Sequence, residues 1–130
     1  MKKYFFSLLI ALSLLTACTE PNSGVTEQTL APADFQQHLQ AHNGMLLDVR
    51  TPEEFTAGHL NHAINIDYKS SDFKDQLAKL DKTKPYFVYC KAGVRSEKAT
   101  EIMKELGFTN VYHMEGGIDA WQEKGLPVLR

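Results

Sequence analysis

Short apolar segments alternate with segments of helical spacing along most of this chain, and this alternation is the feature that most restricts its fold. The apolar segments at 45–49 (MLLDV) and 85–90 (PYFVYC) are suited to strands buried on both faces. The clearest helical pattern ends at Gly107 and has apolar residues at Ala99, Ile102, Met103 and Leu106. The alternation predicts an α/β domain with a mainly parallel central sheet flanked by helices on both faces.

The remaining elements fit the same scheme. We expect strands at 63–66 and 110–113, and helices at 32–41, 52–58, 70–80 and 117–125. Ser70 or Ser71 is expected to cap the helix at 70–80, and Trp121 is expected to lie in the core. The 130 residues, 43% hydrophobic and 23% charged, correspond to one globular domain with additional segments. The formal charge of −2 gives no reason to expect nucleic acid as a partner.

The first residues have the order of a secretory signal peptide: Lys2 and Lys3, then an apolar run, then small residues. The sequence Leu-Thr-Ala-Cys that ends at Cys18 resembles the processing box of bacterial lipoproteins. This resemblance implies that residues 1–17 are removed and that Cys18 is lipidated. A plain signal peptide cut nearby and a single-span anchor are the alternatives, although the run is short for a span of about 20 residues.

Lipidation of Cys18 would place the protein in a bacterial cell envelope, anchored to a membrane and facing the periplasm. Residues 18–28 would then be the lipidated cysteine and a polar, flexible tether, although the end of this stretch could instead form a short first strand. Acylation of one of the two cysteines would leave Cys90 as the free thiol, which excludes a disulfide framework.

Cys90 stands at the carboxyl end of a predicted strand, where ligands bind in open α/β sheets. The loop that follows contains Gly93, which can adopt a positive φ and allow backbone N–H groups to converge. A helix is expected to start near Ser96, with first-turn N–H groups left for a ligand or for water. That helix start and two cations, Lys91 and Arg95, would stabilise a thiolate and attract an anionic sulfur compound. A buried structural cysteine is the alternative.

This loop resembles the active-site loop of the single-domain rhodaneses, which are sulfurtransferases. The matching residues are Cys90, Lys91, Ala92, Gly93, Val94, Arg95 and Ser96. Two further stretches resemble rhodanese signatures, within residues 47–60 and 115–128, so that the resemblance covers roughly residues 29–128. It implies a rhodanese-like domain at 29–130. The departure is Asn61-His62, where the family usually has a proline-glycine turn.

The resemblance implies that Cys90 removes the outer sulfur of thiosulfate or a similar anionic donor and becomes a persulfide. A thiol, a cyanide-like nucleophile or a thioredoxin-like protein would then accept that sulfur, so ping-pong kinetics are expected. Residues 91–96 would bind the donor, and neither a cofactor nor a metal is expected. Lys91 and Arg95 would orient the departing anion, although Arg95 could instead pair with an acid and hold the loop in shape.

Three residues of the stretch at 47–60 are expected to lie near the Cys90 loop and support it without contacting the donor. The family implies a structural ion pair between Arg50 and Glu54, while spacing alone equally allows a weak solvated pair. Asp48 ends the neighbouring strand and would either orient loop groups or cap a turn.

Two other functions compete with sulfur transfer. Phosphatases and arsenate reductases of related fold resemble a Cys-x5-Arg pattern, whereas here four residues separate Cys90 from Arg95. The shorter loop suits a sulfur atom better than a tetrahedral oxyanion. A non-catalytic rhodanese-like binding module is the other alternative, although such modules usually lack the cysteine. The histidine pairs 38/42 and 59/62 show no recognisable zinc pattern.

Overall fold

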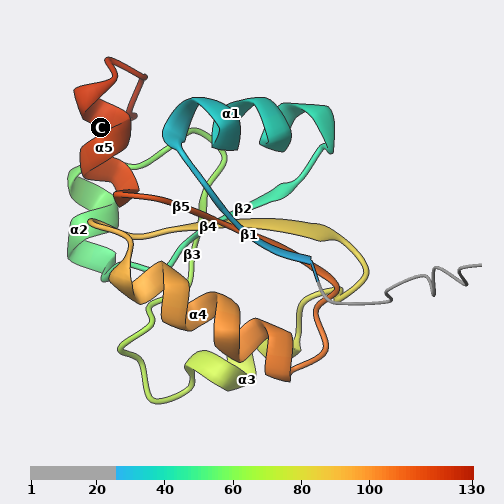
Figure 1. Cartoon of the computed structure of the whole chain (residues 1–130). Helices are drawn as coiled ribbons and strands as arrows, with labels where there is room; N and C mark the ends of the chain where they lie inside the picture. The colour runs from blue at the N-terminus through green and yellow to red at the C-terminus, as the bar shows by residue number, and fades with distance from the viewer. Residues whose placement is uncertain (1–25) are drawn as a thin grey trace, which may run out of the picture.

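The computed structural model describes residues 26–130, and a five-stranded sheet lies at its centre (Figure 1). The strands are ordered β1-β5-β4-β2-β3, and every neighbouring pair is parallel. Their bounds are Thr26–Leu30 (β1), Met45–Asp48 (β2), Ile64–Asn65 (β3), Pro85–Tyr89 (β4) and Asn110–Met114 (β5). The predicted parallel α/β architecture is confirmed.

Helices cover both faces of this sheet. Their bounds are Pro32–Ala41 (α1), Pro52–Ala57 (α2), Phe73–Ala78 (α3), Val94–Glu105 (α4) and Gly117–Glu123 (α5). In Figure 1, α1 and α5 lie on one side of the sheet and α3 and α4 on the other, with α2 at one end. None of the helices within residues 26–130 is long and apolar enough to cross a membrane.

Two apolar clusters hold these layers together, and strand residues point alternately into one or the other. Leu47 and Val88 belong to the cluster under α3 and α4, whereas Leu46 and Phe87 belong to the cluster under α1 and α5. Trp121 is 4% exposed in the second cluster, which confirms it as a core residue. Both faces of β2 and β4 are therefore buried, which explains why these strands read as continuous apolar runs.

Several element boundaries differ from the sequence-based expectations, among them the starts of α3, α4 and β1. Helix α3 starts after Asp72, and neither Ser70 nor Ser71 is its N-cap; the Ser70 hydroxyl donates to the Asp72 carboxylate instead. Helix α4 begins two residues before Ser96. Strand β1 begins at Thr26 because it pairs in register with β5, so it takes the last three residues of the expected tether. The predicted signal peptide, Cys18 and the rest of the tether lie outside the described residues.

Candidate active site

Cys90 directly follows β4, an inner strand of the sheet, and is 1% exposed. Its sulfur contacts the loop that leads into α4. The Gly93 N–H donates to Cys90 Sγ at 3.1 Å, and the Ser96 hydroxyl oxygen lies 3.5 Å from the same sulfur. The expected position of the thiol, at a strand end and beside a helix N-terminus, is therefore present in the structure.

Gly93 gives the loop its shape and starts α4. It has a φ of 102°, and a Cβ on it would lie 3.2 Å from the Gly116 nitrogen. Both the left-handed conformation and the close approach favour glycine at this position. The Glu97 N–H then donates to the Gly93 carbonyl at 3.1 Å and closes the first helical turn. Ser96 consequently lies inside that turn, fully buried, and donates to the Gly93 carbonyl at 3.0 Å.

The two cations of the loop have carboxylate partners. Arg95 forms a two-pronged pair with Glu54, at 2.8 and 3.1 Å, which corresponds to the alternative role considered for this arginine. Lys91 pairs with Asp119 at 2.7 Å, and both of these side chains are largely exposed. Between the two cations, Ala92 and Val94 are exposed to solvent, with Val94 at 60%.

The predicted ion pair between Arg50 and Glu54 is wrong, because each residue has another partner. Glu54 occupies the third position of α2, where a reciprocal capping box joins it to Thr51. From there its carboxylate reaches Arg95 on α4. The hydrogen bonds from Arg95, together with the nearby guanidinium charges, lower the pKa of Glu54 to about 2.

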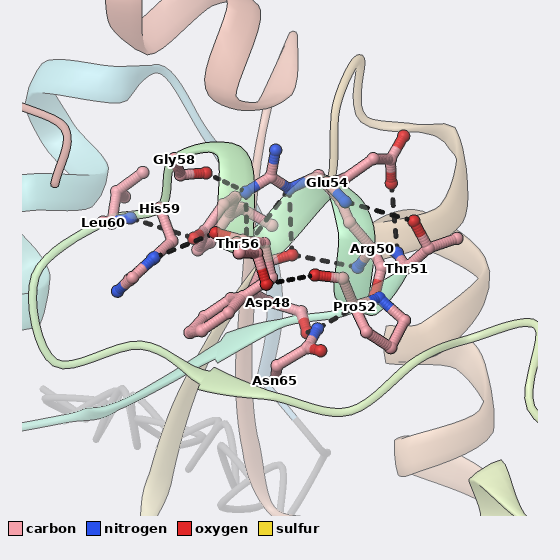
Figure 2. Close-up of polar contacts among 12 residues, drawn as sticks. Asp48, Arg50, Thr51, Pro52, Glu54, Thr56, Gly58, His59, Leu60 and Asn65 are labelled. Atoms are coloured by element: carbon pink, nitrogen blue, oxygen red, sulfur yellow. Dashed lines mark hydrogen bonds and ion pairs between the residues drawn. The ribbon is translucent and has the colours of Figure 1, made fainter. Parts of the chain in front are cut away.

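Arg50 instead pairs with Asp48 in the interior (Figure 2). The Asp48 carboxylate accepts hydrogen bonds from the Arg50 backbone N–H, Nε and Nη2, at 2.7–3.1 Å. Arg50 Nη2 also donates to the Gly58 carbonyl at 2.6 Å. Burial acts to lower the pKa of Arg50, but the bonds and charge of Asp48 outweigh it and raise that pKa. Asp48 thus caps the turn at Arg50 through the backbone N–H, as the sequence allowed, and also anchors the Arg50 side chain.

Several supporting residues were not singled out in the sequence. Asn65 on β3 donates to the backbone carbonyls of Asp48 and Arg50, at 3.0 and 2.9 Å (Figure 2). The Tyr89 hydroxyl accepts from the Leu60 N–H at 3.1 Å. Burial, followed by the charge of Asp48, raises the pKa of Tyr89. Only the Thr-x-x-Glu capping box starting at Thr51 has a sequence signal that could have been found.

Helix α5 supports the loop from the opposite side. The Ile118 N–H donates to the Cys90 carbonyl at 2.9 Å, and the Asp119 N–H donates to the Lys91 carbonyl at 3.1 Å. A Cβ on Gly117 would lie 2.3 Å from the Lys91 carbonyl oxygen, so only glycine allows this approach. The Gly116-Gly117 turn therefore packs closely against the Cys90 loop.

A cavity of about 240 Å³ lies beside the Cys90 loop. It is bounded by α2, α5 and the end of the chain. Its lining residues are Arg50, Glu54, Ala57, Gly58, Lys91, Ile118, Asp119, Gln122 and Arg130. A larger cavity, of about 590 Å³, lies between α1 and α5 and contains none of the loop residues. Within residues 26–130 no group of three or more histidine, cysteine, aspartate or glutamate side chains could hold a metal ion.

The sequence pattern of the rhodanese-like domain family matches residues 31–124. Similar curated proteins include the tRNA uridine(34) hydroxylases of Hamiltonella defensa and Sodalis glossinidius, each 35% identical over 81% of this chain. The matched region is 34% and 35% of those proteins, so the chain spans about a third of their length.

Two solved structures share the fold at comparable identity. A rhodanese-related protein from Thermoplasma volcanium is 34% identical, with a TM-score of 0.70 over 78% of this chain and 97% of that one. A polysulfide-sulfur transferase homodimer from Wolinella succinogenes is also 34% identical, with a TM-score of 0.65 over 82% of this chain and 79% of that one.

Proposed function

This chain belongs to the rhodanese-like domain family, and from that premise we propose that it is a sulfurtransferase carrying sulfane sulfur on Cys90. The observation that carries the proposal is the position of Cys90 Sγ, which accepts a hydrogen bond from the Gly93 N–H at the start of α4. Such a position favours negative charge on sulfur, both as a thiolate and as a persulfide. The proposed donor is thiosulfate or a similar anion, and the acceptor is a thiol, a cyanide-like nucleophile or a thioredoxin-like protein.

The reaction divides into two displacements at sulfur. In the first, the Cys90 thiolate attacks the outer sulfur of thiosulfate; a new S–S bond forms, the old S–S bond breaks, and sulfite leaves with the bonding electron pair. In the second, an acceptor thiolate attacks the outer persulfide sulfur, and the Cys90 thiolate leaves. Atoms and charge balance in each step without an added oxidant or reductant. The free enzyme is regenerated after it has reacted with one donor and one acceptor.

The loop backbone would stabilise the charge that moves during these steps. The Gly93 N–H already contacts the sulfur, and the first-turn N–H groups of α4 lack side-chain caps. Fixed donors of this kind stabilise developing charge without having to reorganise. Ser96, 3.5 Å from Sγ, would hold the sulfur in place through its own bond to Gly93. Lys91 and the exposed residues Ala92 and Val94 would border the path of the donor, and Arg95 would hold the loop through Glu54.

The relatives support the chemistry more than they identify the substrate. The Wolinella protein is a polysulfide-sulfur transferase, which favours a chain of sulfur atoms as an alternative donor here. The tRNA uridine(34) hydroxylases are about three times as long as the region they share with this chain, so we do not extend their substrate to it.

We also propose that the protein is a lipoprotein of a bacterial cell envelope, held to a membrane through Cys18 and facing the periplasm. The basis is the sequence of residues 1–18. Expression of the full chain in a bacterium with radioactive palmitate should label the protein, and Cys18→Ser should abolish the label. A labelled Cys18→Ser variant, or an unlabelled parent chain, would contradict the anchor.

The sulfurtransferase proposal is tested by measuring the mass of the intact protein by mass spectrometry after incubation with thiosulfate. The full chain carrying Cys18→Ser leaves Cys90 as its only thiol, because the sequence has two cysteines. We expect a gain of one sulfur atom that cyanide removes and that is absent when Cys90→Ser is added. No gain with thiosulfate or polysulfide, while Cys90 still reacts with iodoacetamide, would contradict sulfur transfer and favour a binding role.

A further inference from the structure

The two cations of the Cys90 loop and the neighbouring Arg50 are largely neutralised by their own partners. The three pairs are Arg50–Asp48 at 2.7 Å, Lys91–Asp119 at 2.7 Å and Arg95–Glu54 at 2.8 Å. A paired cation presents a dipole to an approaching anion, and a dipole attracts it much less than a full charge does. These pairs therefore leave open which side chain selects an anionic donor.

Arg130 is the remaining cation in the lining of the cavity beside the loop. Within residues 26–130 its side chain has neither an ion pair nor a side-chain hydrogen bond. It is exposed, and it lies outside the region matched by the family, 31–124. Neither the family nor the loop motif assigns it a role.

The backbone holds Arg130 at this position. Residues His59 and Leu129 form an isolated antiparallel bridge, with N–H donors at 2.9 and 2.8 Å from the opposite carbonyls. Gly58 permits the approach, because a Cβ there would lie 3.2 Å from Val128 Cγ1 and 3.6 Å from Arg130 Cγ. The Gly58 carbonyl also accepts from buried Arg50. The backbone that carries Arg130 is thus joined to the same framework that supports the Cys90 loop.

We propose that Arg130 is a specificity-determining residue that selects small anionic sulfur donors in the cavity beside the Cys90 loop. The inference rests on the proposed sulfur transfer and assigns its substrate class. An unpaired guanidinium keeps its full positive field, which raises the local concentration of anions such as thiosulfate relative to neutral polysulfane-type donors. The residue acts on binding, so its loss should raise KM and leave kcat nearly unchanged.

Two alkylating agents test this selection without requiring sulfur transfer. Iodoacetate is an anion and iodoacetamide is neutral, and both attack the same thiol. In the full chain with Cys18→Ser, we expect Arg130→Gln to lower the ratio of the iodoacetate rate to the iodoacetamide rate by about threefold to tenfold. Arg130→Glu should lower the ratio further, and Arg130→Lys should largely retain it. The matched control is Lys124→Gln, an exposed cation at the end of α5 that does not line the cavity, and it should leave the ratio unchanged.

The outcomes separate this inference from the proposed function. An unchanged ratio in Arg130→Gln and Arg130→Glu would overturn the role of Arg130, whether or not a persulfide forms. A lowered ratio in a chain that takes up no sulfur would keep the anion selection and contradict sulfur transfer. The iodoacetamide rate itself reports whether each variant keeps the loop folded. In a chain that forms the persulfide, Arg130→Gln should also raise KM for thiosulfate by a similar factor, and the effect should shrink at high salt.

Discussion

The Cys90 loop is supported from two sides, and the two supports are built from different interactions. On the side of α2, the support consists of side chains: Arg50 with Asp48 in the interior, and Arg95 with Glu54 nearer the surface. On the side of α5, the support consists of backbone hydrogen bonds to the Cys90 and Lys91 carbonyls. The ion pair on the α5 side, between Lys91 and Asp119, is exposed and adds little.

This difference determines how each support can be broken. A side-chain support fails when one partner loses its charge, and it responds to pH. A backbone support has no side chain to remove. It can be broken only by adding a side chain at a glycine that packs closely against the loop. Three substitutions, Asp48→Asn, Gly117→Ala and Glu54→Gln, test the two supports, in decreasing order of expected effect.

Asp48→Asn should destabilise the protein most. The Arg50 side chain is 7% exposed, and the change leaves its charge buried with the carboxylate removed. Loss of one partner of a buried pair typically costs about 3–5 kcal/mol in the free energy of unfolding. Urea denaturation measures this cost. The matched control is Asp119→Asn, which breaks an ion pair of the same length at the surface, where a loss of at most about 1 kcal/mol is expected. Equal losses in the two variants would contradict the importance of burial.

Gly117→Ala should break the backbone support on the α5 side. The new Cβ would lie 2.3 Å from the Lys91 carbonyl oxygen and 2.5 Å from the Cys90 carbonyl oxygen, at a φ of 60°. The clash and the left-handed conformation together should cost about 2–4 kcal/mol of unfolding free energy. Displacement of the loop should also expose Cys90 and raise its iodoacetamide rate.

The control for this change is Gly125→Ala. Gly125 has a φ of 71°, but nothing lies within 4 Å of a Cβ placed there. It therefore carries the left-handed strain without the clash, and a loss of about 1–2 kcal/mol with unchanged Cys90 reactivity is expected. If the two variants behaved alike, backbone conformation and not contact with the loop would explain the glycine at 117.

The sequence predicts the elements of this site better than the partners within it. The inner strands β2 and β4 are buried on both faces, so their apolar runs are visible without any knowledge of the fold. The position of Cys90 follows from the end of such a run. The sequence predicts the start of α4 two residues too late, because the left-handed conformation of Gly93 lets the first helical turn begin inside the loop motif.

The partners depend on distances that the sequence does not contain. Glu54 and Arg95 are 41 residues apart, and they meet only because α2 and α4 both begin at the edge of the sheet where Cys90 lies. The spacing of four between Arg50 and Glu54 favoured a local pair instead. Arg130 was not singled out because its place beside the loop depends on the bridge between His59 and Leu129, which no local pattern indicates.

Glu54→Gln is expected to have the smallest effect on stability and a distinctive dependence on pH. The amide keeps the capping oxygen for the Thr51 N–H and loses the charge that Arg95 contacts, so a loss of about 1 kcal/mol is expected at neutral pH. Because the pKa of Glu54 is lowered from 4.5 to about 2 in the folded protein, its contribution is fully present above about pH 4.5 and is lost as the pH falls towards 2. The stability of the parent chain and the variant, measured by urea denaturation across that range, should therefore converge on acidification. A gap that stayed constant from pH 7 to pH 2 would show that the charge of Glu54 does not support the loop, and the side-chain support would then rest on Asp48 and Arg50 alone.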